Sequence, residues 1–282
     1  MALLLIHDAL PNLASYNTWL AILHLCSLVG IWLLSSSPWP VWVTRARSRW
    51  EPLDASSDLS CGDTACRVVV SYESVVQVHV ETLVLAFHLP AVLSHAYAAR
   101  YGYVAWPRVP HRWIEYAVSA SIMMVCILLL TGITDLWTLM LAFVCCAATQ
   151  GMGYVGELHP RRWLYFWLGC SLMAPVWVVV YYSFYSSLAD AAKSPPTFVY
   201  YIVWTLFVLF MCFAAVNAVQ RAYWLTALGA EKWYMVLSLT AKTALAWQIF
   251  YGALSREENE LQAYNPGDGP ISSTSVGMQQ LR

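Results

Sequence analysis

Seven apolar runs, each long enough to cross a lipid bilayer, divide this sequence of 282 residues. They cover about residues 14–36, 74–99, 110–133, 137–156, 163–186, 197–220 and 232–253. A transmembrane helix needs about 20 mostly apolar residues, and only 11% of this chain is charged, where a soluble domain carries roughly 25%. Because the runs lack the alternating pattern of barrel strands, we predict an all-α, multi-pass protein of the cell membrane, with a seven-transmembrane helix bundle in residues 1–254.

The connection between the first two runs, about residues 37–73, is far longer than the others. Its WVTRAR and CRVVVSY segments have the β-branched, alternating composition of a β-hairpin. The segment CGDTAC holds Cys61 and Cys66, which either form a small disulfide, as an oxidising compartment permits, or remain free thiols. Residues 255–282 are rich in Gly, Pro and Ser, and we predict a disordered tail there.

The basic residues predict which way the bundle is inserted. Seven lie on the face that carries the N-terminus and seven on the opposite face, so the totals do not decide. The first seven lie in short connections close to the runs, whereas the others are spread over a long connection and a tail. We therefore predict a cytoplasmic N-terminus and an extracellular C-terminus.

A lysine interrupts the seventh run. Lys242 lies within LTAKTALAW, and no other charged residue occurs between Lys232 and Arg256. An ammonium group at the middle of a bilayer costs several kcal/mol, so its default interpretation is functional. Three roles remain open: a structural ion pair, a proton or substrate relay, and a covalent imine with an aldehyde cofactor. Each of them needs an opposite charge nearby.

Depth favours Glu115 as the partner of Lys242. Lys242 lies ~15 Å into its run at 1.5 Å per residue, and its side chain leans back toward the start of its helix. Glu115 enters from the same face and lies ~8 Å deep, whereas Glu81 lies near the opposite face, where we expect a structural network with His79. Ser238 precedes Lys242 by one turn, and its hydroxyl bonds either the lysine or its own helix.

Two histidines lie at the depth of this lysine. His24 is about ten residues into the first run, and His88 is about eleven residues from the end of the second. Each is either a hydrogen-bonded core residue or part of a polar cavity that can take up a proton. His95, His111 and His159 lie nearer the ends of the runs, so we expect them to be solvated.

The third and seventh runs together resemble a known family. HRWIEYAVSAS opens the third run and SLTAKTALAW lies in the seventh. Both are similar to segments of the heliorhodopsins, which bind retinal, are distantly related to the microbial pumps and sensors, and insert with the N-terminus inside. The resemblance covers about residues 10–254. It implies all-trans retinal bound as an imine to Lys242, with Ser238 beside the imine and Glu115 as its counterion.

Further positions match the family pattern. Arg112, Trp113 and Tyr116 surround the counterion in the Arg-Trp-x-Glu-Tyr pattern. The chain departs from the pattern at Val84, where a serine beside the counterion is expected, so the carboxylate of Glu115 should receive one hydrogen bond fewer.

The resemblance also implies a proton cavity on the cytoplasmic side, formed by His24, His88, Arg112 and Glu157. Aromatic residues are candidate walls of the retinal pocket, although ordinary helix packing explains each of them equally well. These are Trp113, Tyr116, Trp177, Trp204, Phe207 and Phe210.

The implied function is light sensing without enzymatic turnover, in which the imine proton is exchanged with the cytoplasmic-side cavity. The resemblance implies a homodimer and an unidentified cytoplasmic signalling partner, and nothing suggests nucleic acid or a metal. Two alternatives stay open: a light-gated or light-driven proton transporter or channel, and a ligand-binding receptor without a chromophore.

Overall fold

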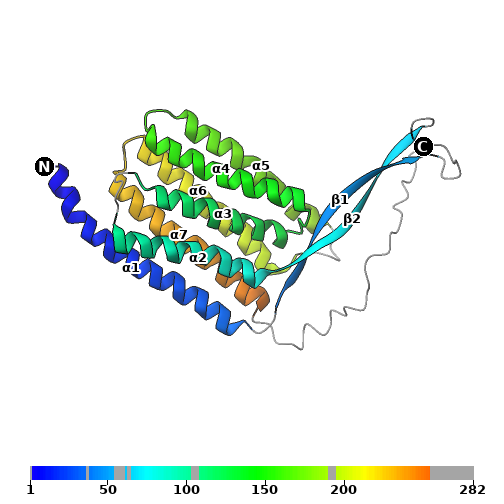
Figure 1. Cartoon of the computed structure of the whole chain (residues 1–282), viewed down its shortest axis with the longest axis horizontal. Helices are drawn as coiled ribbons and strands as arrows, with labels where there is room; N and C mark the ends of the chain where they lie inside the picture. The colour runs from blue at the N-terminus through cyan, green and yellow to red at the C-terminus, as the bar shows by residue number, and fades with distance from the viewer. Residues whose placement is uncertain are drawn as a thin grey trace.

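The computed structural model describes residues 2–35, 38–53, 61, 65–102, 108–189 and 195–254. These residues form seven α-helices, one two-stranded sheet and a short π-helix. In chain order the elements are α1 (Ala2–Leu34), β1 (Pro40–Pro52), β2 (Cys66–His79), α2 (Val80–Tyr101), α3 (Pro110–Leu130), α4 (Leu136–Leu158), α5 (Leu164–Ala189), α6 (Thr197–Arg221), α7 (Ala227–Ile249) and η2 (Phe250–Leu254). The helices lie side by side in one bundle, and the strands project from the end opposite the N-terminus (Figure 1). The predicted tail, 255–282, lies outside the described residues.

The predicted multi-pass architecture is confirmed. Six helices are long and apolar enough to cross a membrane: α1 to α6. The seventh helix, α7, carries Glu231, Lys232 and Lys242, which lower its hydropathy. It packs against α1, α2 and α6, so that Glu231 and Lys242 face the interior of the bundle and are only 3% exposed. A helix with such residues is stable in a bilayer because its neighbours, rather than lipid, surround them.

The second span begins later than the sequence predicts. Residues 74–79 continue strand β2, and α2 begins at Val80. The prediction was wrong here because the run SVVQVH is apolar enough to extend a helix, yet its residues pair with β1. Short apolar runs do not distinguish a strand from a helix by themselves.

The predicted hairpin is present and is anchored to the bundle. Strands β1 and β2 pair in antiparallel register, with a shift between Val43 and Thr44. At that point Val43 is buried in the core, and the Thr44 amide donates a 2.9 Å hydrogen bond to the carbonyl of Thr134, between α3 and α4. The next residue, Asp135, caps α4 by accepting from the Thr138 amide. Burial raises the pKa of Asp135, but its hydrogen bonds outweigh this effect and hold that pKa below its ordinary value.

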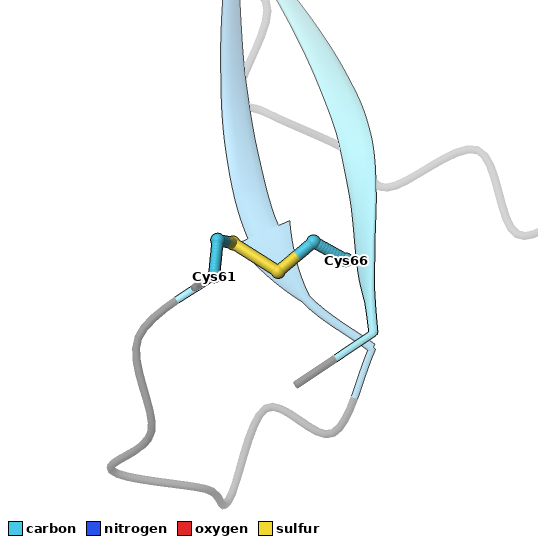
Figure 2. Close-up of a disulfide and its surroundings, with 2 residues drawn as sticks. All are labelled: Cys61 and Cys66. Atoms are coloured by element: carbon cyan, nitrogen blue, oxygen red, sulfur yellow. A yellow bond between two sulfur atoms is a disulfide. The ribbon is translucent and has the colours of Figure 1, made fainter. Parts of the chain in front are cut away.

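The outer part of the hairpin carries an ion-pair cluster and a disulfide. Arg45 and Arg47 both pair with Glu73 on the opposite strand. The hydrogen bond from Arg45 lowers the pKa of the Glu73 carboxyl. At the outer end of the hairpin, Cys66, the first residue of β2, forms a disulfide with Cys61, with a Cα–Cα distance of 5.7 Å (Figure 2).

Helix α3 lies at the centre of the bundle. In its apolar window 67% of the residues are buried, against 17–33% in the other five spans. It packs against α2 and α4 and also contacts α6. Polar side chains on this helix are therefore enclosed by protein, which makes it the natural support for a buried site.

Candidate functional site

Lys242 and Glu115 form an ion pair in the interior of the bundle. Nζ of Lys242 lies 3.1 Å from Oε1 of Glu115, and the two side chains are 3% and 4% exposed. The Nζ group also donates a 2.7 Å hydrogen bond to Oγ of Ser238, one turn earlier on α7. The ring of Tyr116 lies beside the ammonium, with its centroid 5.3 Å from Nζ. Helices α3 and α7 thus hold a cation and an anion away from bulk water.

Helical periodicity explains why these residues meet. Side chains three or four positions apart share one face of a helix. On α3 this spacing aligns Arg112, Glu115, Tyr116 and Ser119, and on α7 it aligns Glu231, Tyr234, Ser238 and Lys242. The two faces are joined by a hydrogen bond of 2.9 Å, which Oη of Tyr116 donates to the main-chain carbonyl of Tyr234. The bond lies one turn before Ser238 and fixes the spacing of the helices beside the ion pair.

The anion has few other contacts. Apart from Lys242, no described group donates a hydrogen bond to Oε1 of Glu115. Val84, at the position where the family pattern has a serine, is fully buried and offers no donor.

A cavity of about 490 Å³ opens beside the ion pair. It lies among α3, α4, α5, α6 and α7, and Lys242 and Ser238 form part of its wall. Its surface is almost entirely apolar and largely aromatic. Five of the six aromatic residues proposed from the sequence line it: Trp113, Tyr116, Trp177, Phe207 and Phe210.

The sixth, Trp204, does not line the cavity. Its side chain is 49% exposed on the outside of α6, and its ring contacts Tyr181 with a centroid distance of 5.4 Å. The sequence analysis named Trp204 with Phe207 and Phe210 as a candidate wall residue, and for Trp204 this was wrong. Helix rotation directs Phe207 inward, onto the buried Trp177.

His24 and His88 form a buried cluster on the other side of the site. Their Nδ1 atoms lie 3.2 Å apart, and both residues are fully buried. His95, which was expected to be solvated, is only 8% exposed. Its ring stacks on His24 at a centroid distance of 5.5 Å, and its Nδ1 lies 2.7 Å from Oδ1 of Asn17. The expectation for His95 was wrong because α1 covers this face of α2.

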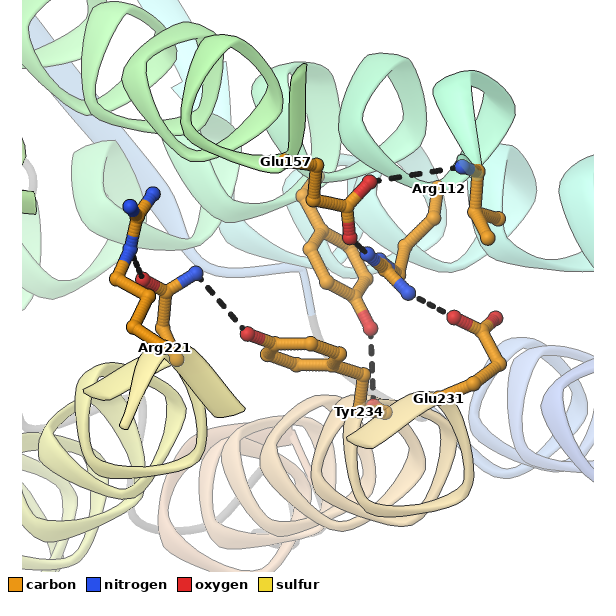
Figure 3. A network of polar contacts seen from close by, with 8 residues as sticks. Arg112, Glu157, Arg221, Glu231 and Tyr234 are labelled. Carbon is orange, nitrogen blue, oxygen red and sulfur yellow. Dashed lines mark hydrogen bonds and ion pairs between the residues drawn. The ribbon is translucent and has the colours of Figure 1, made fainter. Parts of the chain in front are cut away.

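Arg112 and Glu157 belong to a separate cluster near the end of the bundle that carries the N-terminus. The guanidinium of Arg112 pairs with Glu157 from α4 and with Glu231 from α7, and all three side chains are at least nine-tenths buried. The guanidinium also lies over the rings of Trp113 and Tyr234, at 4.9 and 4.4 Å. Figure 3 shows Arg112 between the two carboxylates. The four residues predicted to share one proton cavity are therefore divided between α1/α2 and α3/α4.

Glu231, Tyr234 and His95 were not identified as site residues from the sequence. Glu231 and Tyr234 lie eleven and eight residues before Lys242, which is close to whole numbers of helical turns. Their periodicity was therefore a usable signal. For His95 the available signal was its spacing of seven residues from His88, which places both on one face of α2.

At the opposite end of the bundle, Glu81 and His79 form the small network expected there. Nδ1 of His79 lies 3.3 Å from Oε1 of Glu81, and the amide of Trp39 donates a 3.2 Å hydrogen bond to Oε2. These contacts connect the base of the hairpin to α2, at a distance from the Lys242 site.

The arrangement permits specific chemistry. A buried primary amine in the wall of an apolar cavity can condense with an aldehyde, and the neighbouring carboxylate can compensate the positive charge of the product. The same pair without an aldehyde would serve only as a structural ion pair.

Comparisons with known proteins found a matching family and a similar fold. The family model described as Heliorhodopsin matches residues 13–254. Among solved structures, the fold is similar to that of a light-driven proton pump, LR (Mac), from Leptosphaeria maculans, with a TM-score of 0.57 and 13% sequence identity over 85% of this chain and 94% of that chain. A comparison with curated protein sequences found no match.

Proposed function

Because the chain belongs to the heliorhodopsin family, we propose that it is a light-sensing membrane protein that binds retinal through an imine on Lys242. The observation that carries the proposal is the buried Lys242–Glu115 pair in the wall of an apolar cavity. In this assignment Glu115 is the counterion, and Ser238 holds the nitrogen in place.

The residues of the cavity fit a retinal molecule. Ligand cavities of about 300–1,000 Å³ with mainly apolar walls are typical of small-molecule sites, and this one measures about 490 Å³. A conjugated polyene has no polar groups along its length, so the rings of Trp177, Phe207 and Phe210 suit it. Trp177 is 3% exposed and touches both phenylalanine rings, with centroid distances of 5.2 and 5.6 Å. These contacts give the cavity a rigid wall.

In this proposal Glu115 stabilises the protonated imine, and its distance from the nitrogen controls how firmly the proton is held. A protonated imine is stable in an apolar site only if an anion compensates it, and Glu115 supplies that anion. When bound, retinal supplies a polyene that isomerises on illumination. Any movement of the nitrogen of Lys242 away from Glu115 weakens the ion pair and favours release of the proton.

His24 and His88 are the proposed acceptors of that proton. Their Nδ1 atoms lie 3.2 Å apart, and the Nε2 atoms of both have no described partner. An imidazole in that situation can take up a proton within the interior of the protein. His95 extends the cluster toward Asn17.

The position of the ionisable residues favours sensing over transport. A pump needs proton-binding groups on both sides of the imine. In the part of the chain that the structure describes, the buried acidic, basic and histidine side chains lie level with Lys242 or nearer the N-terminal end of the bundle. On the hairpin side, Glu81 and His79 are paired with each other at the base of the hairpin.

The proposal also covers the isomer of the chromophore, the orientation in the membrane, the oligomeric state and the partner. It takes the dark chromophore as all-trans, the N-terminus as cytoplasmic, and the protein as a homodimer that signals to a cytoplasmic partner without enzymatic turnover. The N-terminal end of the bundle, where Arg112 and both its carboxylate partners are buried, is the end that would face that partner.

Addition of all-trans-retinal to the purified chain tests the proposal. We expect a visible absorption band to form, Lys242→Ala to abolish it, and Glu115→Gln to change its wavelength. Glu81→Gln is the matched control, because Glu81 lies near the hairpin base, and it should leave the band unchanged. A colourless wild type would refute retinal binding, and a large reversing photocurrent under voltage clamp would favour a channel over a sensor.

A further inference from the structure

The cavity continues beyond the neighbourhood of Lys242. Along α5 its wall runs from Tyr181 to Tyr165, which corresponds to ~24 Å of helix at 1.5 Å per residue. Along α6 it runs from Phe207 to Arg221. Phe213 lies close to the Lys242 site: its ring centroid is 5.5 Å from that of Tyr116, and the Tyr116 centroid is 5.3 Å from Nζ of Lys242. About two turns of α6 therefore separate this site from Arg221, and we call this part of the cavity the Arg221 arm.

Arg221 ends the arm with a buried positive charge. The residue is 6% exposed and lines the cavity. Its Nε donates a 2.7 Å hydrogen bond to Oδ1 of Asn217, and its Nη1 donates a 3.2 Å bond to the carbonyl of Arg162. Both acceptors are neutral.

No carboxylate among the described residues forms an ion pair with Arg221. The nearest acidic influence comes from Glu157, which is already engaged by Arg112 (Figure 3). The Nη2 group of Arg221 donates to no described acceptor. A buried guanidinium with neutral partners and a free donor is able to bind an anion, because a hydrogen bond from a charged donor to a carboxylate is strong.

The walls of the arm are apolar. Trp113, Tyr165 and Phe166 line it. Gly153 lines the α4 side, where a side chain would collide with Trp113. Gly156, on the same helix, lies against the Arg221 guanidinium. The arm thus combines apolar walls with one unpaired donor, on Arg221, at its end.

We propose that the Arg221 arm binds a long-chain carboxylic acid of the fatty-acid class, with its carboxylate on Arg221 and the start of its chain between Trp113 and Phe166. The bilayer supplies such acids directly to a site between membrane helices. Arg161 and Arg162, exposed on the α4–α5 connection, attract anions to this end of the bundle. This site is separate from the retinal function and does not depend on it.

The proposal is tested by comparing the binding of palmitic acid with that of hexadecanol. The two molecules have the same chain length and differ in the headgroup. Binding is measured by the shift in thermal midpoint and by tryptophan fluorescence, on both retinal-free and retinal-reconstituted protein in detergent. We expect saturable binding of palmitic acid, with hexadecanol at least about tenfold weaker, because a bond to a charged group is lost. Acid binding is measured on retinal-free protein as well. A protein that forms no visible band, which would refute retinal binding, can therefore still show whether the Arg221 arm binds the acid.

Arg221→Gln should weaken palmitic acid binding by about 10- to 100-fold. The matched control is Arg162→Gln, which removes an exposed neighbouring charge and keeps the carbonyl that Arg221 uses; it should change binding less than about twofold. Arg221→Lys keeps the charge without the fork and should give an intermediate affinity. Equal binding of hexadecanol and palmitic acid, equal losses in the two glutamine variants, or binding of an anionic phospholipid in preference to the acid would each overturn the proposal. If Arg221→Gln does not fold, the comparison of the two ligands on the wild type still decides.

Discussion

Replacement of Glu115 by glutamine leaves the buried ammonium of Lys242 without an anion. In the structure the two charged groups are 3.1 Å apart and at most 4% exposed. Removal of one partner of a buried ion pair costs about 3–5 kcal/mol, because the remaining charge is uncompensated. The hydrogen bond to Ser238 does not replace the missing negative charge.

An independent estimate gives a similar magnitude. Lys242 can avoid the penalty by folding in its neutral form. An amine with the ordinary pKa of about 10.4 loses its proton at pH 7 at a cost of about 4.6 kcal/mol, from 1.36 kcal/mol per unit. The destabilisation of the Glu115→Gln variant should therefore not exceed about 5 kcal/mol at pH 7.

The same reasoning predicts a pH dependence. If Lys242 is neutral in the folded variant, the unfolded chain binds one more proton than the folded chain. Stability then rises with pH, by about 1.36 kcal/mol per unit, until pH approaches 10.

Unfolding by sodium dodecyl sulfate in mixed micelles, followed by tryptophan fluorescence at pH 7, 8 and 9, measures both effects. Glu81→Gln is the control, and it should cost less than about 1 kcal/mol because its partner His79 is 43% exposed. The double variant Glu115→Gln/Lys242→Met should recover most of the loss, since no charge is left buried. A Glu115→Gln variant with wild-type stability, or with a loss that does not change with pH, would refute the reasoning.

Three further outcomes follow from the contacts. Arg112→Gln should cost about 3–5 kcal/mol in the same unfolding assay, because two carboxylates stay buried, and replacement of both carboxylates by glutamine should restore most of it. Gly153→Ala should cost about 1–3 kcal/mol and slow retinal uptake, measured by the growth of the visible band, because its methyl group would collide with Trp113. Glu73→Gln should speed amide hydrogen exchange in the hairpin at pH 7; because Arg45 lowers the pKa of Glu73, the difference should disappear only when the pH falls through that lowered value, and a difference that persists below it would contradict the assignment.

Periodicity and depth were sufficient to predict the centre of the site. Lys242 is a charge in an apolar run, and Glu115 is the acidic residue that enters from the same face at a compatible depth. Hydrophobic length likewise predicted the bundle, because the bilayer imposes a nearly constant thickness on each span.

The residues at which helices and strands begin and end were less predictable from the sequence. SVVQVH, before α2, has the hydropathy of a span and the β-branched residues of a strand, and pairing with β1 decided between them. A strand is stabilised by hydrogen bonds to residues distant in the sequence, so local composition does not determine it.

The clusters around the ion pair also depended on tertiary packing. Trp204 and Phe207 are one turn apart and similar in chemistry, yet one faces outward and the other lines the cavity. Arg112 was assigned to the histidine cavity from the sequence and instead contacts Glu157 and Glu231. Hydropathy does not specify helix rotation, since an aromatic ring is equally compatible with lipid and with a protein interior.

The sequence by itself determined that this chain spans a membrane and that it carries a buried cation with one suitable anion, because bilayer thickness and the cost of burying charge act on each helix separately. The tertiary structure alone decided which side chains surround that pair, that His95 joins the histidines, and that Arg221 faces a cavity with no carboxylate partner among the described residues. These features arise from the rotation and neighbours of each helix. They depend on how helices distant in the sequence pack together, and no single run of residues contains that information.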